Sequence, residues 1–270
     1  MTRPIEIAIA GLHKGFGGKQ VLRGVDLEVQ AGDTLAIVGG SGCGKTVLLD
    51  HILGKLTPDS GRIEVVDHDD PQQPLRDLAT VGALEIERIH KHWGVVFQRN
   101  ALFSGTVHDN IALWLRDIAG LDEQVVRARA RSVLEVVGLR TDDAFLATDQ
   151  HDLSGGMAKR LAIARALAME PIVLFYDEPT TGLDPTNAGR MHDLIFATHN
   201  ASLPGGVERT TVIITHDKDL LTRLRPRTVL LHEGRVHFDG PFRAFEQADS
   251  DIIRPYFEMM PILNQRPLAR

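Results

Sequence analysis

Cysteine is almost absent from the 270-residue chain, where Cys43 is the only one. A single thiol excludes an internal disulfide framework and fits a reducing compartment. Long apolar runs are missing as well, since no stretch approaches the roughly 18 residues that a membrane-spanning helix needs. The apolar run near the N-terminus is too short for a signal peptide. We therefore expect that, if the chain works at a membrane, a partner supplies the anchor.

Basic residues are also fewer than acidic residues. Lys and Arg number 30 against 36 Asp and Glu, which gives a net charge of −6 and a pI near 6.0. A general nucleic-acid binder is usually basic, so we expect no nucleic acid as a partner. Apolar residues make up 43% and charged residues 24%, which is ordinary for a globular protein and excludes long disorder, collagen and coiled coil as the main architecture.

Short apolar runs alternate with segments of helical period along most of the chain. Strand patterns cover residues 5–12, 21–29, 34–38, 62–66, 94–98, 172–176, 211–215, 229–231 and 235–238. Helical patterns cover residues 45–54, 78–90, 125–137, 157–168 and 186–201. This alternation favours an α/β fold with a mostly parallel central sheet. Residues 67–77 are polar and proline-bearing, so we expect an exposed loop with its acidic cluster in solvent.

The pattern turns helical, with only loops between the helices, after the strand at 94–98. We therefore expect one domain over residues 1–240, with a core at about 1–98 and 166–240 and an inserted helical subdomain at about 99–165. Residues 241–270 are expected to form a helical tail with an apolar face that needs a partner.

A glycine cluster follows the buried strand at 34–38. Residues 39–46 read GGSGCGKT and match the motif G-x-x-x-x-G-K-[ST]. Glycines let the backbone curl round a polyphosphate so that successive N–H groups point inward, and the next helix adds the positive end of its dipole. Lys45 would reach the β- and γ-phosphates, and the Thr46 hydroxyl would bind Mg²⁺. The expected phosphate contacts are Gly39, Gly40, Ser41, Gly42, Cys43, Gly44, Lys45 and Thr46.

A chance glycine loop is the alternative interpretation of this segment. It is disfavoured because a strand precedes the loop and an amphipathic helix follows it, which is the context that the motif requires. No feature near Cys43 argues for a general base that would activate it, so we expect a backbone spacer and not a nucleophile.

Two carboxylates end the apolar run at 172–176. A buried parallel strand delivers its last side chains to the carboxyl edge of the sheet, where ligands bind. Asp177 would hold the Mg²⁺ shell, and Glu178 would polarise the attacking water as a general base. The alternative interpretation is that the two carboxylates lie at a solvent-exposed strand end without a function, and the phosphate loop in the same chain disfavours it.

The segment LSGGM at residues 153–157 carries a family resemblance. With it, the chain resembles the nucleotide-binding subunits of ABC transporters over residues 5–240. Gln98 is similar to that family's Q-loop glutamine, residues 179–184 to its D-loop, His216 to its switch histidine, and Phe16 to its adenine-stacking aromatic. The resemblance implies a P-loop NTPase core with an antiparallel N-terminal β portion and an inserted helical signature subdomain.

The resemblance also implies how such a subunit works. Two copies would form a head-to-tail dimer with ATP between the phosphate loop of one copy and Ser154, Gly155 and Gly156 of the other, with Asp184 also at the nucleotide. Gln98 would contact Mg²⁺ and the attacking water and would report to an integral-membrane permease. His216 would bind the γ-phosphate. The implied location is the cytoplasmic face of the inner membrane, through the permease.

Several departures from the family pattern are visible. Val47 replaces a frequent hydroxyl residue, Met157 replaces the usual Gln of the signature, Phe16 replaces the commoner Tyr and Gly40 a frequent Pro. The stretch at 66–94 is longer than expected. None of these changes removes a catalytic group.

Three segments narrow the resemblance to one group within that family. LSGGM, FQRNALFSGTVHDNI and the tail SDIIRPYFEMMPIL resemble the ATPases of Mla/Mce-type lipid transporters. Those transporters move phospholipids or sterol-like lipids between membranes with a permease and a lipid-binding MCE protein. In that group the tail helps to hold the ATPase dimer together.

Other functions stay open. An ABC transporter ATPase for amino acids, metals or drugs is the main alternative. A soluble ABC protein acting on ribosomes or DNA usually carries two sets of motifs or a long coiled coil, and this chain shows neither. A switch that binds ATP without hydrolysing it would lack the base or the histidine, yet both Glu178 and His216 are present.

Overall fold

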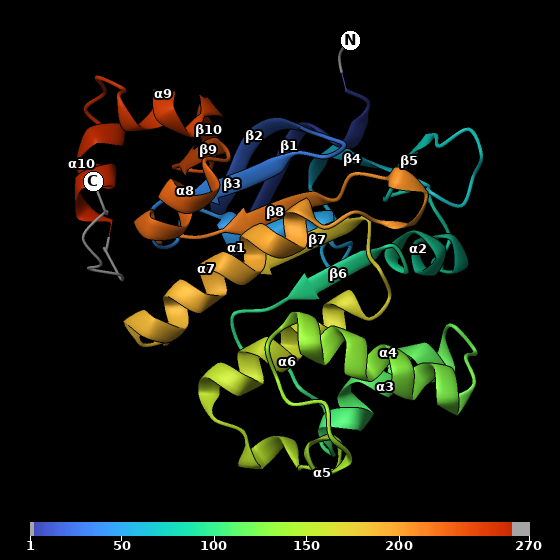
Figure 1. Ribbon diagram of the computed structural model, residues 1–270. Coiled ribbons are helices and arrows are strands. Elements are labelled where there is room, and N and C mark those ends of the chain that lie inside the picture. The colour runs from blue at the N-terminus through green and yellow to red at the C-terminus, as the bar shows by residue number, and fades with distance from the viewer. Residues whose placement is uncertain (1–2, 261–270) are drawn as a thin grey trace.

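Two β-sheets and the helices around them make up residues 3–260, the part of the chain that the computed structural model describes (Figure 1). One sheet has the strand order β2-β1-β4-β5 and the other has the order β10-β9-β3-β8-β7-β6. The first consists of β1 (Ile5–Phe16), β2 (Lys19–Gln30), β4 (Ser60–Val66) and β5 (Leu75–Asp77). The second consists of β3 (Thr34–Val38), β6 (Trp93–Val96), β7 (Val173–Asp177), β8 (Thr210–Ile214), β9 (Arg227–His232) and β10 (Arg235–Pro241).

The six-stranded sheet is parallel except at one edge. β3 pairs in parallel with β8 and β9, and β7 pairs in parallel with β8 and β6, whereas β10 is antiparallel to β9. Every residue of β7 and β8 is buried, which is the pattern of parallel strands covered on both faces. The first sheet is antiparallel throughout. The predicted α/β fold, with its antiparallel N-terminal portion, is therefore confirmed.

Helices cover both faces of the central sheet. α1 (Lys45–Ile52) lies between the two sheets, where its Leu48 shares an apolar cluster with Phe175 of β7 and with residues of the antiparallel sheet. Alternate residues of a strand point to opposite faces, and the other face of β7 packs with α6 (Gly155–Leu167) and α7 (Pro185–Asn200). The strands are thus fixed by apolar contacts on two sides.

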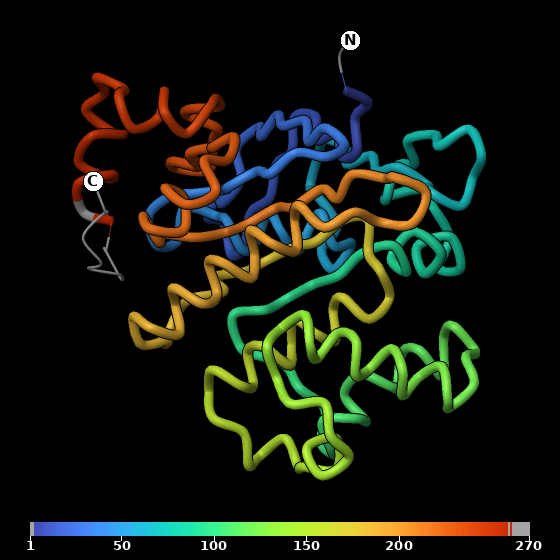
Figure 2. Tube along the Cα trace, in the orientation of Figure 1, coloured from blue at the N-terminus to red at the C-terminus, as the bar shows by residue number. Residues whose placement is uncertain are grey.

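The chain between β6 and β7 forms a helical lobe. Figure 2 shows it as the green segment that leaves the central sheet after β6 and returns through α6. An apolar cluster joins its helices and continues onto β7. The remaining elements of the lobe are α3 (Val107–Asp117), α4 (Glu123–Val136), α5 (Asp143–Leu146) and a 3₁₀ turn at Gln150–Asp152.

The long segment between β4 and β6 is tied to the antiparallel sheet. Asp67 is completely buried and accepts a hydrogen bond from the Arg88 guanidinium of α2 (Ala83–His90). His68 Nε2 lies 2.7 Å from Oε1 of Glu6 on β1. The expectation of a solvated acidic loop is therefore wrong for Asp67, since an arginine from a later helix offsets the cost of burying its charge.

The predicted helix at 78–90 begins only at Ala83. Residues 77–80 form a turn instead, in which the Asp77 carboxylate accepts the N–H of Ala79 and the Asp77 carbonyl accepts that of Thr80. Local side-chain bonding of this kind competes with helix formation.

The C-terminal helices pack on the end of β3. α8 (Lys218–Leu224), α9 (Phe242–Glu246) and α10 (Ile253–Met259) share an apolar cluster with Val38. Figure 1 shows α9 and α10 together beside α8. A further 3₁₀ turn spans Pro204–Gly206. Within residues 3–260 no helix combines the length and apolar character that crossing a membrane requires, and the predicted tail beyond residue 260 lies outside the described residues.

We expect Arg88→Ala to lower the free energy of unfolding by about 1–3 kcal/mol, because it leaves the buried Asp67 carboxylate without its cation. Urea denaturation followed by circular dichroism measures the change. Arg254→Ala is the control, since it breaks an ion pair with Glu258 whose side chains are 71% and 65% exposed and should stay within about 0.5 kcal/mol of the parent. Equal stabilities of the two variants would contradict the role given to Asp67.

Candidate functional site

Three neighbouring parallel strands end at one edge of the central sheet, and each is followed by predicted site residues. Residues 39–46 follow β3, the pair 177–178 lies at the end of β7, and His216 lies two residues after β8. Ile214 of β8 pairs with Asp177 and, on its other side, with β3. The register therefore brings the three strand ends to the same level, at the edge where open α/β sheets bind ligands.

The loop at 39–46 has glycine at two positions where a side chain would be unfavourable. A Cβ on Gly39 would lie 2.3 Å from the carbonyl oxygen of Leu231 and 2.6 Å from Cys43 Sγ. Gly44 has a φ of +109° directly before α1, a conformation that side-chain-bearing residues rarely adopt. Burial raises the pKa of the Cys43 thiol, and a protonated thiol agrees with its interpretation as a spacer.

Lys45 lies back on its own loop. Its Nζ donates hydrogen bonds to the carbonyls of Gly39, at 2.6 Å, and Gly40, at 3.1 Å. Thr46, the next residue of α1, is exposed together with Ser41. An ammonium group and a hydroxyl thus stand at the mouth of a loop whose shape suits an anion.

Asp177 is buried beside other negative charges, with 8% of its surface exposed. Burial raises its pKa, and the carboxylates of Glu178 and Asp50 raise it further, while Lys45 and Lys55 act in the opposite direction. A cation bound here would relieve that repulsion. Carboxylate and hydroxyl oxygens are also the donors that Mg²⁺ prefers, so Asp177 and the neighbouring loop fit such an ion.

Glu178 and His216 contact each other directly. The His216 Nδ1 atom lies 2.7 Å from Oε2 of Glu178. This hydrogen bond raises the pKa of His216, although partial burial opposes the rise. Glu178 also has a φ of +48°, a strained conformation for a non-glycine residue that is typical of functional sites.

A buried pair behind His216 was not predicted from the sequence. Asp217 accepts a hydrogen bond from Nε2 of His192 on α7 at 2.7 Å and also caps α8 through the N–H groups of Asp219 and Leu220. Burial raises the pKa of Asp217, but the hydrogen bond and charge of His192, together with hydrogen bonds from Thr180 and Leu220, outweigh it and hold that pKa below its usual range. Asp217 thereby anchors the residue next to His216. Its position after a strand and before a helix was a usable signal, whereas His192 carries none.

The signature segment at 154–156 starts α6. Ser154 caps this helix by accepting the N–H of Met157 at 3.3 Å. Gly156 faces Asn187, since a Cβ there would lie 3.2 Å from the Asn187 side chain. Within residues 3–260, no hydrogen bond joins the signature to the phosphate loop of the same chain. The structure therefore does not bring these two predicted half-sites together in one copy.

Asp184 ends the predicted D-loop as the N-cap of α7. Its carboxylate accepts the N–H groups of Thr186 and Asn187 and the side-chain amide of Asn187. The hydrogen bonds from Asn187 are the main reason that the pKa of Asp184 is lowered. Through Asn187, Asp184 is connected to Gly156 of the signature.

Gln98 and Phe16 lie at the ends of their strands. Gln98 is exposed two residues after β6, at the same sheet edge as Asp177. Phe16 ends β1 with 46% of its surface exposed, and the Lys14 ammonium lies 5.5 Å from its ring centre. An exposed ring of this kind is available for stacking. In the described part of the chain, no group of three or more His, Cys, Asp or Glu side chains could hold a metal ion by itself.

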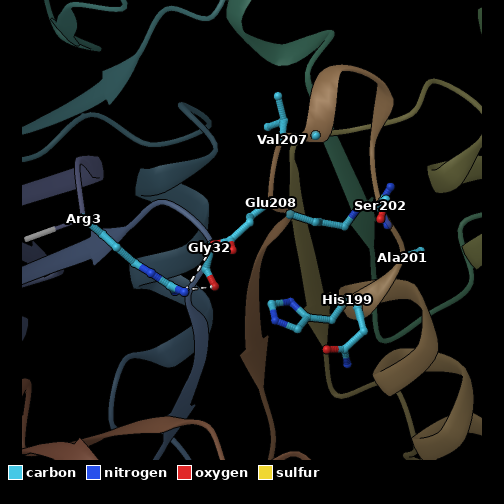
Figure 3. A pocket seen from close by; sticks show the side chains of 10 residues that line it. Arg3, Gly32, His199, Ala201, Ser202, Val207 and Glu208 are labelled. Atoms are coloured by element: carbon cyan, nitrogen blue, oxygen red, sulfur yellow. Dashed lines mark hydrogen bonds and ion pairs between the residues drawn. The ribbon is translucent and has the colours of Figure 1, made fainter. Parts of the chain in front are cut away.

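A separate polar recess opens where β3 and β8 begin, at the opposite end of these strands. It encloses about 420 Å³ and is lined by Arg3, Gly32, His199 and Glu208 among others. Figure 3 shows Arg3 reaching the Gly32 carbonyl, with Glu208 beside it. His199 is held by two threonine hydroxyls at 2.8 and 3.0 Å. Because its polar groups already have partners, this recess is a weaker candidate than the strand ends.

Comparison with known proteins identifies the family. The family profile described as "ABC transporter" matches residues 22–181. The L-cystine transport system ATP-binding protein TcyN of Escherichia coli is 36% identical over 254 residues, which cover 93% of this chain and 97% of that protein. The methionine import ATP-binding protein MetN of Caulobacter vibrioides is 38% identical over 225 residues, 83% of this chain, and the match spans 63% of that protein.

A plant relative and a solved structure extend the comparison. The chloroplastic protein TRIGALACTOSYLDIACYLGLYCEROL 3 of Arabidopsis thaliana is 30% identical over 259 residues, 91% of this chain and 71% of that protein. An ATP-binding cassette solved as a dimer in a post-hydrolysis state with ADP and Pi has a TM-score of 0.74 and 26% identity, covering 88% of this chain and 99% of the cassette. The chain therefore belongs to the ABC transporter family, within which it is an ATP-binding and ATP-hydrolysing domain.

Proposed function

We propose that this chain is the energy-coupling ATPase of a membrane transporter and that two copies enclose ATP head to tail. The convergence of the phosphate loop, the acidic pair at 177–178 and His216 at one sheet edge carries the proposal. The signature at 154–156 has its own helix N-terminus, at the start of a 13-residue helix, and this suits an anion. A second copy would place its signature against the first copy's ATP, and the dimeric cassette among the solved structures supports this arrangement.

Each of the two half-sites makes different contacts with ATP. The loop at 39–46 holds the phosphates through its N–H groups and Lys45, while the exposed Phe16 ring stacks on adenine. The signature serine and glycines, Ser154, Gly155 and Gly156, together with Asp184, complete the nucleotide site of the other copy. ATP then joins two surfaces, and loss of the γ-phosphate separates them.

Hydrolysis depends on Glu178 as general base. Glu178 polarises the attacking water, Gln98 orients it, and His216 and Lys45 bind the γ-phosphate. In the structure His216 is bonded to Glu178, so a γ-phosphate that attracts the imidazole also releases the carboxylate. Mg²⁺ supplies charge neutralisation when it is bound, and Thr46, Gln98 and Asp177 are the residues that would hold it.

We propose the domain boundaries that the sequence predicts. We assign residues 1–240 to one ATPase domain, with the helical subdomain at 99–165 inserted into a core at 1–98 and 166–240. The element order supports the division, because α3, α4 and α5 all lie between β6 and β7, which are neighbouring strands of the core. Two large apolar side chains of the helical lobe are partly exposed: Phe103 in the loop before α3 is 39% exposed, and Trp114 on α3 is 42% exposed. Such a patch suits the permease that would hold the subunit at the cytoplasmic face of the membrane.

Lipid is the cargo that we propose, together with an MCE-type lipid-binding partner. The segment LSGGM and the tail from residue 250 resemble the Mla/Mce group, and one relative bears the name of a galactolipid. The names of other relatives refer to L-cystine and methionine, so an amino-acid transporter is the second candidate.

Glu178→Gln is expected to slow ATP hydrolysis by at least about 100-fold, because the amide cannot accept the water proton. ATP binding should persist, and the variant should accumulate as a dimer with ATP and Mg²⁺. Phosphate release and sedimentation velocity measure the two effects. Glu208→Gln, in the recess at the far end of the strands, is the matched control with parental turnover. Unchanged turnover in Glu178→Gln, or a monomer saturated with ATP, would refute the mechanism.

The imidazole of His216 should titrate above the ordinary histidine pKa of roughly 6.5, because its hydrogen bond to Glu178 favours the charged form. This bond stabilises the fold fully at pH values below the ordinary value and is lost as the pH rises through the raised pKa. NMR titration of the ring measures it. Glu178→Gln should lower the pKa of His216 and Glu208→Gln should not, whereas the same value in all three proteins contradicts the assignment.

Purification of the full chain from its native membranes tests the cargo. We expect a permease, an MCE-domain protein and bound phospholipid to accompany it, as identified by mass spectrometry. The hydrolysis-deficient Glu178→Gln protein serves as a second bait that holds the assembly in its ATP-bound form. Recovery of an amino-acid permease without an MCE protein would overturn the lipid assignment and leave the ATPase mechanism intact.

A further inference from the structure

The C-terminal helix α10 contacts the phosphate loop of its own chain. The Gly39 N–H donates to the Tyr256 hydroxyl at 2.8 Å, and that hydroxyl donates to the Gly39 carbonyl at 3.2 Å. The two residues are 217 positions apart in the chain. We infer that Tyr256 is a positioning residue that holds the base of the phosphate loop and so sets the affinity for ATP. The inference rests on the proposed role of residues 39–46 in binding phosphate.

Apolar packing fixes the helix that carries Tyr256. Ile253 and Met260 on either side of it are 4% and 5% exposed, in a cluster that includes Val38 of β3, the residue before Gly39. The Lys218 ammonium at the start of α8 lies 3.9 Å from the Phe257 ring centre. α10 is therefore docked both beside the loop and on the helix that follows His216.

Gly39 has little room to shift toward other hydrogen-bond partners if the Tyr256 hydroxyl is removed. It is buried, and the Leu231 carbonyl and the Cys43 sulfur occupy the space beside its Cα. Tyr256 satisfies both the N–H and the carbonyl of this one residue. A hydroxyl with a donor and an acceptor function can do this, whereas a phenyl ring would leave two buried backbone groups without that partner.

The Gly39 carbonyl also accepts the Lys45 ammonium, at 2.6 Å. Lys45 leaves this carbonyl when it turns toward phosphate, and a buried carbonyl without a partner is unfavourable. Tyr256 keeps the carbonyl paired during that exchange, which favours the ATP-bound loop. Burial raises the pKa of Tyr256 to about 12, so the hydroxyl keeps the proton that it donates.

Tyr256→Phe tests the inference, because it keeps the ring and removes only the hydroxyl. We expect the KM and the Kd for ATP to rise about fivefold to tenfold, the effect of losing one net hydrogen bond, with kcat within about twofold of the parent. Steady-state ATPase assays and titration with a fluorescent ATP analogue provide the two constants. Thermal unfolding of the same protein shows whether it is folded.

Tyr176→Phe is the matched control. Tyr176 is the other of the two tyrosines, and its fully buried hydroxyl lies 3.1 Å from Thr198 on α7, away from the loop. The Tyr176→Phe substitution should lower the melting temperature and leave the KM for ATP unchanged. A Tyr256→Phe protein with a lower melting temperature and an unchanged KM would show a merely structural tyrosine and would overturn the inference.

Lys45→Ala separates this inference from the proposed function. If Lys45→Ala binds ATP as the parent does, residues 39–46 are not the phosphate site and both proposals fail. If Lys45→Ala loses ATP binding while Tyr256→Phe keeps the parental KM, only the positioning role fails. If Lys45→Ala loses ATP binding and Tyr256→Phe has a raised KM for ATP, both the proposed function and the positioning role of Tyr256 are supported.

Discussion

The parallel pairing of β3, β8 and β7 is the constraint on which the site depends. These strands are buried on both faces, so their register is fixed by the apolar core and not by the polar residues that follow them. A slip by one residue would turn every buried side chain to the opposite face and would also shift Asp177 against the phosphate loop. The positions of the groups that, in our proposal, act on ATP are thus set by hydrophobic packing beneath them.

Local patterns were sufficient to predict the strand-end residues. The glycine loop and the acidic pair at 177–178 each follow a short apolar run, and the rule that parallel strands present their carboxyl ends together brings them to one edge. His216 was identified through the family resemblance, and the same rule places it at that edge because it follows the strand at 211–215. The 2.7 Å contact between Glu178 and His216 follows from this topology. The family resemblance also added the signature, the D-loop, Gln98 and Phe16, which strand patterns alone do not indicate.

Contacts between distant segments were beyond prediction from one sequence. Asp67 looks like a surface residue until Arg88, 21 positions later, is placed against it. The bond of Asp217 to His192 and that of Tyr256 to Gly39 likewise join segments with no shared periodicity. Each is a polar group whose burial is tolerated only because a partner arrives from elsewhere in the fold.

The groups that would act on phosphate are bonded within the chain before ATP arrives. Lys45 is held by the carbonyls of Gly39 and Gly40, and His216 is held by Glu178. Phosphate oxygens compete well for the Lys45 ammonium, because charge-assisted hydrogen bonds are stronger than those to a neutral carbonyl. For His216 a phosphate oxygen would replace one carboxylate oxygen as the acceptor. Their transfer leaves a carbonyl that Tyr256 keeps paired and a Glu178 carboxylate that is free to polarise water. In the proposed mechanism, binding of the γ-phosphate therefore itself creates the active base, so hydrolysis follows occupation of the site without any separate activating step.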